Sequence, residues 1–517
     1  MSVILSRLAA RPRLTVLVFG LLLLTSGNWI LPLLDRDEPR FAEAGREMRQ
    51  RDDWVVPWFN GDYRFDKPPL IYWCETVSYR VLGENEFAAR LPGVLFSLAT
   101  ALLLVEWGRR LNRPRAGFFG ALMYLGCVQV QIHGRLAVAD MPMVFFYTLA
   151  AWSGWEFTRP GVESTGSARR WWLAFFGALG LGFLAKGPEA WLPILGLAIL
   201  GRRWPAGFLL RAGQVWVGLV ITLAITAAWG VPALIRTQGQ FLSIGLGHHV
   251  IYRSVGVVDG HGAAGWGMYV VQLPLYLLTF FFSFFPWGFR VPGRLCAWWP
   301  ERRQDLPGSY LLVQAAIVFT VFTLVRTKLP HYTLPAFPLL ALWLALQLEG
   351  QPDFSRWFGR RLIGMTVALL ALTWIGFAAL RPEFVAEEIW AKLAPQVRPE
   401  TRVASVGYGE ASLVWKFRAV TTNYLVLAPM PGQVTNFLAQ PGPWIFITPK
   451  GYAPPIPVQT NGATAITITG GDVSRWNFTR QPFRLGRLTL PGWTLRPRQW
   501  ELTAWLSPDP KNAGRTP

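Results

Sequence analysis

Long apolar segments recur along the first 380 residues of this chain and are separated by short polar connections. A helix needs about 20 residues with few charges to cross the hydrocarbon of a bilayer. The pattern therefore predicts a polytopic α-helical membrane protein with about eleven spans, or up to about thirteen if short helices are added. The segments lie near residues 13–34, 91–108, 116–132, 141–158, 171–185, 188–201, 212–235, 266–289, 309–325, 333–348 and 362–380.

The pattern changes after residue 381, where prolines punctuate a polar connection and short β-like runs follow. Alternating and β-branched residues bounded by turn residues are typical of strands. Residues 381–517 are therefore predicted to form a small soluble domain of the α/β class or mainly of strands, with α/β preferred. Residues 1–380 are predicted to form a membrane domain with long outward loops at 35–90 and 237–265. The predicted elements are strands at Val403–Tyr408, Trp444–Thr448, Ala463–Thr469 and Phe483–Leu490, and a helix at Glu410–Phe417.

Composition supports this class and excludes others. The chain is 52% hydrophobic and only 15% charged, which is too apolar for a soluble enzyme. Its net charge of +20 is scattered over short loops without a basic stripe, so no nucleic-acid partner is expected. The three cysteines lie apart and give no disulfide framework or metal motif.

The distribution of arginine predicts the orientation of the spans. Cytoplasmic loops of membrane proteins carry an excess of Lys and Arg. The first apolar run is too long for a signal peptide, and no small-residue cleavage site follows it. With a retained first span and a cytoplasmic N-terminus, the C-terminal segment lies outside. The inward loops then hold Arg109, Arg110, Arg113 and Arg115, Arg159, Arg169 and Arg170, Arg202, Arg203 and Arg211, Arg290, Arg294, Arg302 and Arg303, and Arg356, Arg360 and Arg361.

Histidine and lysine fall on the opposite side in this topology. All five histidines lie at outward ends, as do the three lysines before residue 390, which are Lys67, Lys186 and Lys328. Coincidence in a small sample is one interpretation. A polar catalytic cavity on the outer face is the other, because ionisable residues packed against spans usually mark a functional site.

Two charged motifs frame the first outward loop. Asp37-Glu38-Pro39-Arg40 follows the first span, and Asp66-Lys67-Pro68-Pro69 follows about 25 residues later. Capping of an amphipathic interfacial helix at 38–50 would account for Asp37, and snorkelling would account for Lys67. The planar fork of Arg40 and a lysine held by two prolines instead suit a lipid phosphate.

Further candidates lie at the other outward ends. Asp140 precedes a span, where capping is an equally good explanation, and Lys186 stands in a turn where it needs an anionic partner. His249 and Arg253 share one loop with His248, although adjacent histidines point different ways on a helix and are a weak metal signal. Lys328 and Tyr332 begin a later span together with Arg326 and His331, so this segment holds two cations, an imidazole and a phenol.

Taken in order, these residues resemble the protein O-mannosyltransferase-like family of polyprenyl-phosphate-sugar glycosyltransferases, and most closely its lipid A aminoarabinose transferase branch. The resemblance spans residues 1 to about 380. It is carried by Asp37-Glu38-x-Arg40, Arg46-Glu47-Met48, Asp53-Trp54, Pro57-x-Phe59-Asn60-Gly61, Lys67-Pro68-Pro69-Leu70, Gly83-Glu84-Asn85, Arg90, Asp140, Lys186-Gly187, His249 and Lys328-Leu329-Pro330-x-Tyr332-x-Leu334-Pro335.

The resemblance implies a GT-C fold in the cytoplasmic membrane of a bacterium. It also implies inverting transfer of a sugar, such as 4-amino-4-deoxy-L-arabinose, from a polyprenyl phosphate to an extracytoplasmic acceptor such as lipid A. Asp37 matches the family's essential acidic residue, and Asp140 is a second catalytic candidate. The residues expected to bind the donor phosphate or substrate are Arg40, Lys67, Lys186, Arg253, Lys328 and Tyr332. Asp66 and His249 look like the positions where relatives can hold zinc or magnesium.

Several alternatives stay open at this point. Asp66 stands where a glutamate is more usual, and His248 replaces an acidic residue, so the sugar and the metal are undetermined. The family also includes members that act on other glycolipids, polysaccharides or proteins. A transporter of an anionic lipid or sugar would place its charges near the midplane of two repeated halves, and no repeat is visible here. A non-catalytic scaffold would not require the Asp37 and Lys67 motifs.

Overall fold

The structure of the chain is a computed structural model. It describes residues 7–159, 166–201, 212–252, 265–381, 384–422, 424–427, 431–452, 463–480, 483–485, 488–490 and 493–507. The chain forms two compact units. The first comprises Met1–Asn28, Met48–Pro57 and Tyr63–Ala371, and the second comprises Trp29–Glu47, Trp58–Asp62 and Leu372–Pro517. The start of the first outward loop therefore groups with the C-terminal part of the chain.

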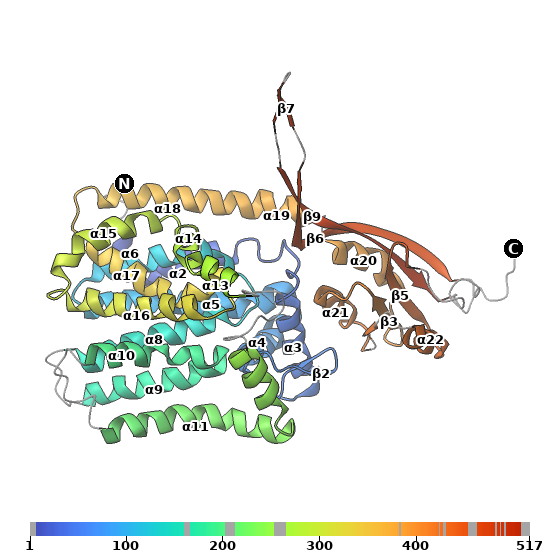
Figure 1. Cartoon of the computed structure of the whole chain (residues 1–517), viewed down its shortest axis with the longest axis horizontal. Helices are drawn as coiled ribbons and strands as arrows, with labels where there is room; N and C mark the ends of the chain where they lie inside the picture. The colour runs from blue at the N-terminus through green and yellow to red at the C-terminus, as the bar shows by residue number, and fades with distance from the viewer. Residues whose placement is uncertain are drawn as a thin grey trace. The chain divides into compact units, whose positions relative to one another are not determined.

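The first unit is a bundle of helices whose longer members lie side by side (Figure 1). Its helices are α2 (Pro12–Thr25), α4 (Leu70–Leu82), α5 (Glu86–Arg110), α6 (Pro114–Leu125), α7 (Val128–His133), α8 (Asp140–Thr158), α9 (Gly166–Lys186), α10 (Leu192–Gly201), α11 (Ala212–Arg236), α13 (Trp266–Gln272), α14 (Leu275–Ser283), α15 (Val291–Trp298), α16 (Leu306–Leu324), α17 (Phe337–Leu348) and α18 (Phe354–Ala371). Shorter elements join them, among them the 3₁₀ helices η1 (Pro188–Trp191) and η5 (Pro330–Ala336) and the π-helix η2 (Phe241–Tyr252).

Each predicted span corresponds to a helix or a pair of helices, so the prediction of a polytopic helical protein is confirmed. Within the described ranges, six helical stretches are long and apolar enough to cross a membrane. Two further apolar helices are shorter, Pro12–Thr25 and Pro188–Leu200, and the second begins at a proline directly after α9. A proline cannot donate the hydrogen bond that would continue the helix through it. The pattern missed α4, which lies within the predicted loop 35–90.

Small residues allow α5 and α6 to pack closely. A Cβ atom on Gly108 would lie 2.3 Å from the Cα atom of Gly117, and one on Gly117 would lie 2.8 Å from the carbonyl oxygen of Leu104. Close backbone approach through small residues is a common way for helices to associate in membranes, where lipid offers no hydrophobic drive. The two glycines therefore fix the spacing of this helix pair.

The two ends of α8 carry different charged groups. At its C-terminal end Glu156 is buried, with Arg110 Nε 2.9 Å from its Oε1 atom and Trp152 Nε1 donating to the same oxygen at 3.1 Å. Asp140 begins the helix at the other end, about 24 Å away at 1.5 Å per residue. The arginine-rich end and the end with lysine and histidine are thus separated by most of a bilayer's hydrocarbon thickness.

The second unit contains a five-stranded sheet in the order β4-β3-β5-β9-β6. Its strands are β3 (Arg402–Val406), β4 (Tyr424–Leu427), β5 (Trp444–Pro449), β6 (Thr464–Arg480) and β9 (Trp493–Leu506). Strand β3 pairs in parallel with β4 and β5, and β9 pairs antiparallel with β5 and β6. The helices α20 (Val385–Leu393), α21 (Ala411–Phe417) and α22 (Pro431–Ala439) belong to the same unit. The mixture of helices and a sheet agrees with the predicted α/β class.

The helix predicted at 38–50 is present as α3 (Glu38–Arg51), but its surroundings differ from the prediction. An interfacial helix would keep its polar face in water. Here Glu43, Arg46 and Glu47 are at most 1% exposed. Their partners are residues of α21 and the segment after it, more than 350 positions along the chain, which sequence spacing could not reveal.

Candidate active site

Asp140 and Lys186 meet at one end of the helical unit. Asp140 begins α8 and Lys186 ends α9, and the Nζ atom of Lys186 lies 3.0 Å from Asp140 Oδ1. Both side chains are only 10% exposed. Glu189, in η1, places Oε1 3.2 Å from the same ammonium group. A buried charge is strongly destabilising unless it is paired, so the three groups hold one another in place.

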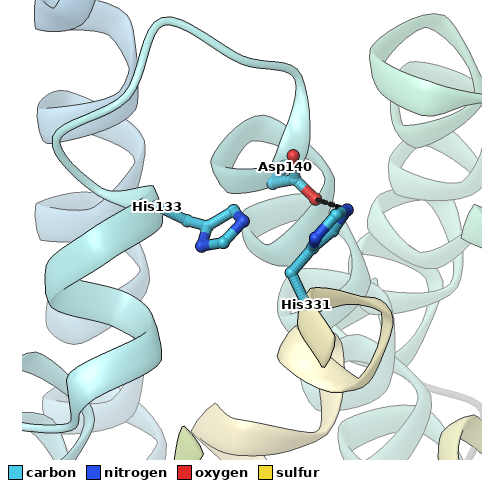
Figure 2. A group of neighbouring side chains, drawn as sticks. All are labelled: His133, Asp140 and His331. Carbon is cyan, nitrogen blue, oxygen red and sulfur yellow. Dashed lines mark ion pairs between the residues drawn. The ribbon is translucent and has the colours of Figure 1, made fainter. Parts of the chain in front are cut away.

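Two histidines complete this cluster, and neither was among the predicted site residues. His133 ends α7 and His331 lies in η5, and both imidazoles point toward Asp140 (Figure 2). His331 Nε2 is 3.9 Å from Asp140 Oδ1, and the two imidazole centroids are 4.8 Å apart. Gln129 Nε2 lies 3.1 Å from His133 Nδ1 and orients that ring. The only sequence signal for the pair is their shared outward side.

The donor set of His133, Asp140 and His331 suits a divalent metal in kind and number. Their ligand atoms all lie within 4.8 Å of one another, and two imidazoles with one carboxylate are ligands that zinc accepts. Lys186 competes for the same carboxylate, because its ammonium already lies 3.0 Å from Asp140 Oδ1. A metal bound here would have to displace that lysine or tolerate its charge.

Tyr332 and Lys328 lie near this cluster in different roles. The Nζ atom of Lys186 lies 5.3 Å from the centroid of the Tyr332 ring, within the range of a cation–π contact. Lys328 turns to the C-terminal end of α16, where Nζ donates to the carbonyl oxygens of Val325, at 2.6 Å, and of Phe322 and Thr323. Positive charge favours a helix C-terminus. In this structure the ammonium of Lys328 caps a helix.

Lys67 and Lys186 both line a largely apolar cavity of about 340 Å³. Asp66 also lines it and forms an ion pair with Arg64, whose Nη1 atom is 2.8 Å from Asp66 Oδ2. Most of the remaining wall is aliphatic or aromatic and comes from α9, α11 and η2. These wall residues include Phe183, Leu223, Trp229, Val231, Leu234 and Phe241. An apolar cavity with cations in its wall fits an amphiphile that has an anionic head.

Asp37 and Arg40 lie in the second unit, at the start of α3. The carbonyl oxygen of Asp37 accepts the amide of Phe41 at 3.2 Å, so this residue stands at the N-cap position of the helix, while its side chain is exposed. Glu38 is 1% exposed, and its Oε2 atom accepts the amide of Leu34 at 2.9 Å. This turn presents the Asp37 carboxylate to solvent, and Arg40 is half-buried one turn further on.

The structure does not describe the side chains of two predicted site residues. Arg253 lies outside the described residues, and the side chain of His249 does too, although its backbone belongs to η2. Their expected roles in binding the donor phosphate and a metal therefore stay predictions. We expected Asp66 to act with His249 as a metal ligand. Asp66 forms an ion pair with Arg64, and this ion pair does not test the expected metal site.

The helical bundle together with the C-terminal sheet domain has the GT-C fold. The family described as dolichyl-phosphate-mannose-protein mannosyltransferase matches residues 66–231, which include Lys67, Asp140 and Lys186. Over these residues the chain is similar to this family of GT-C glycosyltransferases, as the ordered motifs predicted.

The chain is also similar to several proteins that carry the name of one activity. It is 29% identical over 384 residues to the undecaprenyl phosphate-alpha-4-amino-4-deoxy-L-arabinose arabinosyl transferase of Pseudomonas paraeruginosa, covering 72% of this chain and 67% of that one. A second such transferase, from Pseudomonas fluorescens, is 29% identical over 447 residues, covering 81% and 77%. The predicted resemblance to the aminoarabinose transferase branch is confirmed.

Solved structures agree on the fold. ArnT from Cupriavidus metallidurans, bound to undecaprenyl phosphate, superposes with a TM-score of 0.74 at 20% identity, covering 97% of this chain and 99% of that one. The Archaeoglobus fulgidus oligosaccharyltransferase in complex with Zn and sulfate gives 0.50 at 13% identity, covering 85% and 68%. The first match includes the C-terminal sheet domain as well as the bundle.

Proposed function

We propose that this protein transfers 4-amino-4-deoxy-L-arabinose, or a closely related sugar, from undecaprenyl phosphate to an extracytoplasmic acceptor such as lipid A. The observation that carries the proposal is the apolar cavity whose wall contains Lys67 and Lys186. The named activity of the relatives selects the donor and the sugar. Other members of this family act on different acceptors, so the acceptor is identified by the transfer assay described below.

The cavity suits a polyprenyl phosphate donor in both of its chemical parts. Isoprenoid units are apolar and gain free energy from contact with walls such as Phe183 and Trp229. The phosphate is the leaving group, and negative charge grows on it as the bond to the anomeric carbon breaks. Cations fixed in a water-poor site stabilise that charge far better than they do in water. Lys186 is already held by carboxylates, which orients its ammonium before the donor arrives.

The remaining roles are proposed from residue type and from the resemblance to the family. Asp37 acts as a general base on an acceptor hydroxyl, or it stabilises positive charge on the sugar if the acceptor is an ionised phosphate. Asp140 orients Lys186. Binding of the donor phosphate is the role proposed for Arg40, Lys67, Arg253 and Tyr332, and Lys328 is proposed to support it from the end of α16.

A divalent metal, zinc or magnesium, is a further part of the proposal. Two alternative sites are His133 with Asp140 and His331, and Asp66 with His249. Metal analysis of the purified protein, followed by transfer assays after chelation and readdition, separates a required ion from an incidental one. Loss of activity that zinc or magnesium restores supports the proposal, and full activity without metal overturns it.

The site is proposed to face the extracytoplasmic side of a bacterial cytoplasmic membrane. Asp140, Lys186 and His331 lie at the end of the bundle opposite to the arginine-paired Glu156. Arginine-rich loops are retained on the cytoplasmic side. The donor head group and the acceptor would then meet outside the cytoplasm.

A reconstituted transfer assay tests the function. The purified protein is placed in proteoliposomes with undecaprenyl-phosphate sugars and a total lipid extract, and the products are identified by mass spectrometry. We expect addition of the amino sugar to lipid A. No transfer from any polyprenyl-phosphate sugar would overturn the proposal. Asp37→Asn should lower kcat by at least about 100-fold if Asp37 is a general base, and full activity in this variant would remove its catalytic role.

A further inference from the structure

Helix α21 of the C-terminal part contacts the chain on both sides of Asp37. Before Asp37, the carboxylate of Asp35 accepts two hydrogen bonds from Ser412, from the backbone amide at 2.8 Å and from Oγ at 2.5 Å. After Asp37, α3 is held by Trp415 and Arg418, at the end of α21. All of these residues belong to the second unit. Asp37 therefore lies on a short turn that is fixed at both ends by one helix.

The contact after Asp37 is a closed network of charges. Arg46 donates to the Glu43 carboxylate and, at 2.7 Å, to the carbonyl oxygen of Trp415, and its guanidinium stacks 4.2 Å from the centre of the Trp415 ring. Arg418 Nε is 3.0 Å from Glu43 Oε1 and 3.4 Å from Glu47 Oε1. The four charged side chains are at most 8% exposed.

Such a network is a poor way to gain stability but a good way to define geometry. The free energy lost when two charges are removed from water is nearly as large as the free energy gained from their attraction. Proteins in which apolar residues replace a buried ion pair are therefore often at least as stable as the original. Paired arginines with planar guanidinium groups fix both distance and angle. The exposed Asp37 carboxylate has no comparable support of its own in the described structure, so its direction depends on the turn that carries it.

We propose that α21 is the positioning element for Asp37, with Ser412 holding the chain before it and Arg418 holding the helix after it. This inference rests on the proposed catalytic role of Asp37. It assigns the C-terminal domain a task in the reaction, which is to orient the carboxylate. Ser412 and Arg418 are positioning residues, because they act through Asp35 and α3.

Enzyme kinetics on full-length variants test this assignment. Ser412→Ala and Arg418→Met should each lower kcat by about 10- to 100-fold, because a displacement of about 1 Å is enough for such a loss. The KM for undecaprenyl-phosphate sugar should stay within about twofold of the wild-type value, because the contacts that bind the donor in the ground state are not changed. Ser412→Thr keeps the hydroxyl and should restore most of the rate.

Ser507→Ala is the matched control. Ser507 also forms a side-chain hydrogen bond within the second unit, in which its Oγ accepts the backbone amide of Trp444 at 3.1 Å, but it lies in the segment after β9 and this bond involves neither α3 nor α21. It should retain the wild-type rate. Melting temperatures of all variants in detergent show whether a loss of rate comes from unfolding, and Arg418→Met covers the case in which Ser412→Ala does not fold.

The decisive measurement is made in an Asp37→Asn background. If α21 acts through Asp37, adding Ser412→Ala to Asp37→Asn should cause no further loss, because the carboxylate being positioned is already absent. A multiplicative loss in the double variant, or a wild-type kcat in both single variants, would overturn the assignment. Failure of the catalytic proposal is visible separately, as full activity of Asp37→Asn alone.

Discussion

At the scale of single residues, the clearest feature is that two carboxylates share the ammonium group of Lys186. Lys186 lies 3.0 Å from Asp140 and 3.2 Å from Glu189, so a phosphate reaching it meets a cation that is already oriented. The sequence suggested Asp140 and Lys186 separately, each with a structural explanation equally open. The ion pair between them is not explained by a helix cap at Asp140 or by a turn at Lys186, because a capping aspartate does not need a buried lysine.

Lys186→Met is expected to abolish sugar transfer and to destabilise the protein. It removes the cation and leaves the buried Asp140 carboxylate without its closest partner, a loss of about 3 to 5 kcal/mol in comparable pairs. Adding Asp140→Asn should recover part of the stability but none of the activity. Melting temperature and transfer rate measured on the same preparations give both quantities.

Lys392→Met is the control for this substitution. Lys392 pairs with Glu388 at 3.0 Å on the exposed side of α20, where such pairs contribute at most about 1 kcal/mol. It should melt and react like the wild type. A Lys186→Met variant that melts and reacts in the same way as this control would contradict the role assigned to the buried pair.

Asp35 gives a prediction for pH. Burial raises the pKa of Asp35 from 3.8 to about 7, aided by the carboxylates of Glu410 and Asp472 and opposed by the hydrogen bonds from Ser412. Between these two pKa values, Asp35 of the folded protein keeps a proton that Asp35 of the unfolded chain has lost. The resulting stabilisation is complete below about pH 4 and is lost as the pH rises towards 7.

Thermal unfolding between pH 5 and pH 8 checks this sign. The melting temperature of the wild type should fall with increasing pH more steeply than that of Asp35→Asn, which cannot ionise at this position. Parallel pH profiles for the two proteins would show that Asp35 does not titrate differently on unfolding.

At the scale of elements, helix spacing depends on glycines that the hydrophobic pattern does not distinguish. Gly117 in α6 faces Gly108 and the carbonyl groups of α5, whereas a Cβ atom on Gly177 in α9 would meet no atom within 4 Å. Both are glycines in apolar helices. Only the packing of α5 on α6 makes one of them indispensable.

Gly117→Ala is therefore expected to destabilise the bundle by about 1 to 3 kcal/mol, because its methyl group would overlap backbone atoms that cannot move independently. Gly177→Ala should be neutral or slightly stabilising, since alanine favours the helix. Unfolding in a denaturing detergent titration compares the two. Equal stability of both variants would contradict the close packing of α5 and α6.

At the scale of the whole molecule, orientation in the membrane links the charge pattern to function. Arg113 pairs with Glu349 at the arginine-rich end, next to the exposed loop residue Asp353. The connection between α11 and η2 carries the exposed residue Gln240 and belongs to the predicted outward loop 237–265. The two loops should lie on opposite sides of the membrane.

Labelling of single cysteines tests this orientation. In a background in which Cys74, Cys127 and Cys296 are replaced by serine, Asp353→Cys should react with a membrane-impermeant maleimide only after the cells are opened. Gln240→Cys should react once the outer membrane alone is made permeable. The reverse pattern would invert the topology and place the candidate site in the cytoplasm.

The sequence by itself determined the membrane class, the positions of the spans, the C-terminal α/β domain and the resemblance to a glycosyltransferase family. It could do so because apolar length, strand alternation and ordered motifs are local properties of the chain. It also selected Asp140 and Lys186 as individual candidates.

Only the tertiary structure decided which of these candidates belong together. It added His133 and His331 to Asp140, and it turned Lys328 towards the end of α16. It also covered the polar face of α3 with residues beyond position 410. The contacts of His331 with Asp140 and of α3 with Trp415 and Arg418 join residues that are about 190 to 375 positions apart in the sequence. The fold brings them together because buried charges need partners.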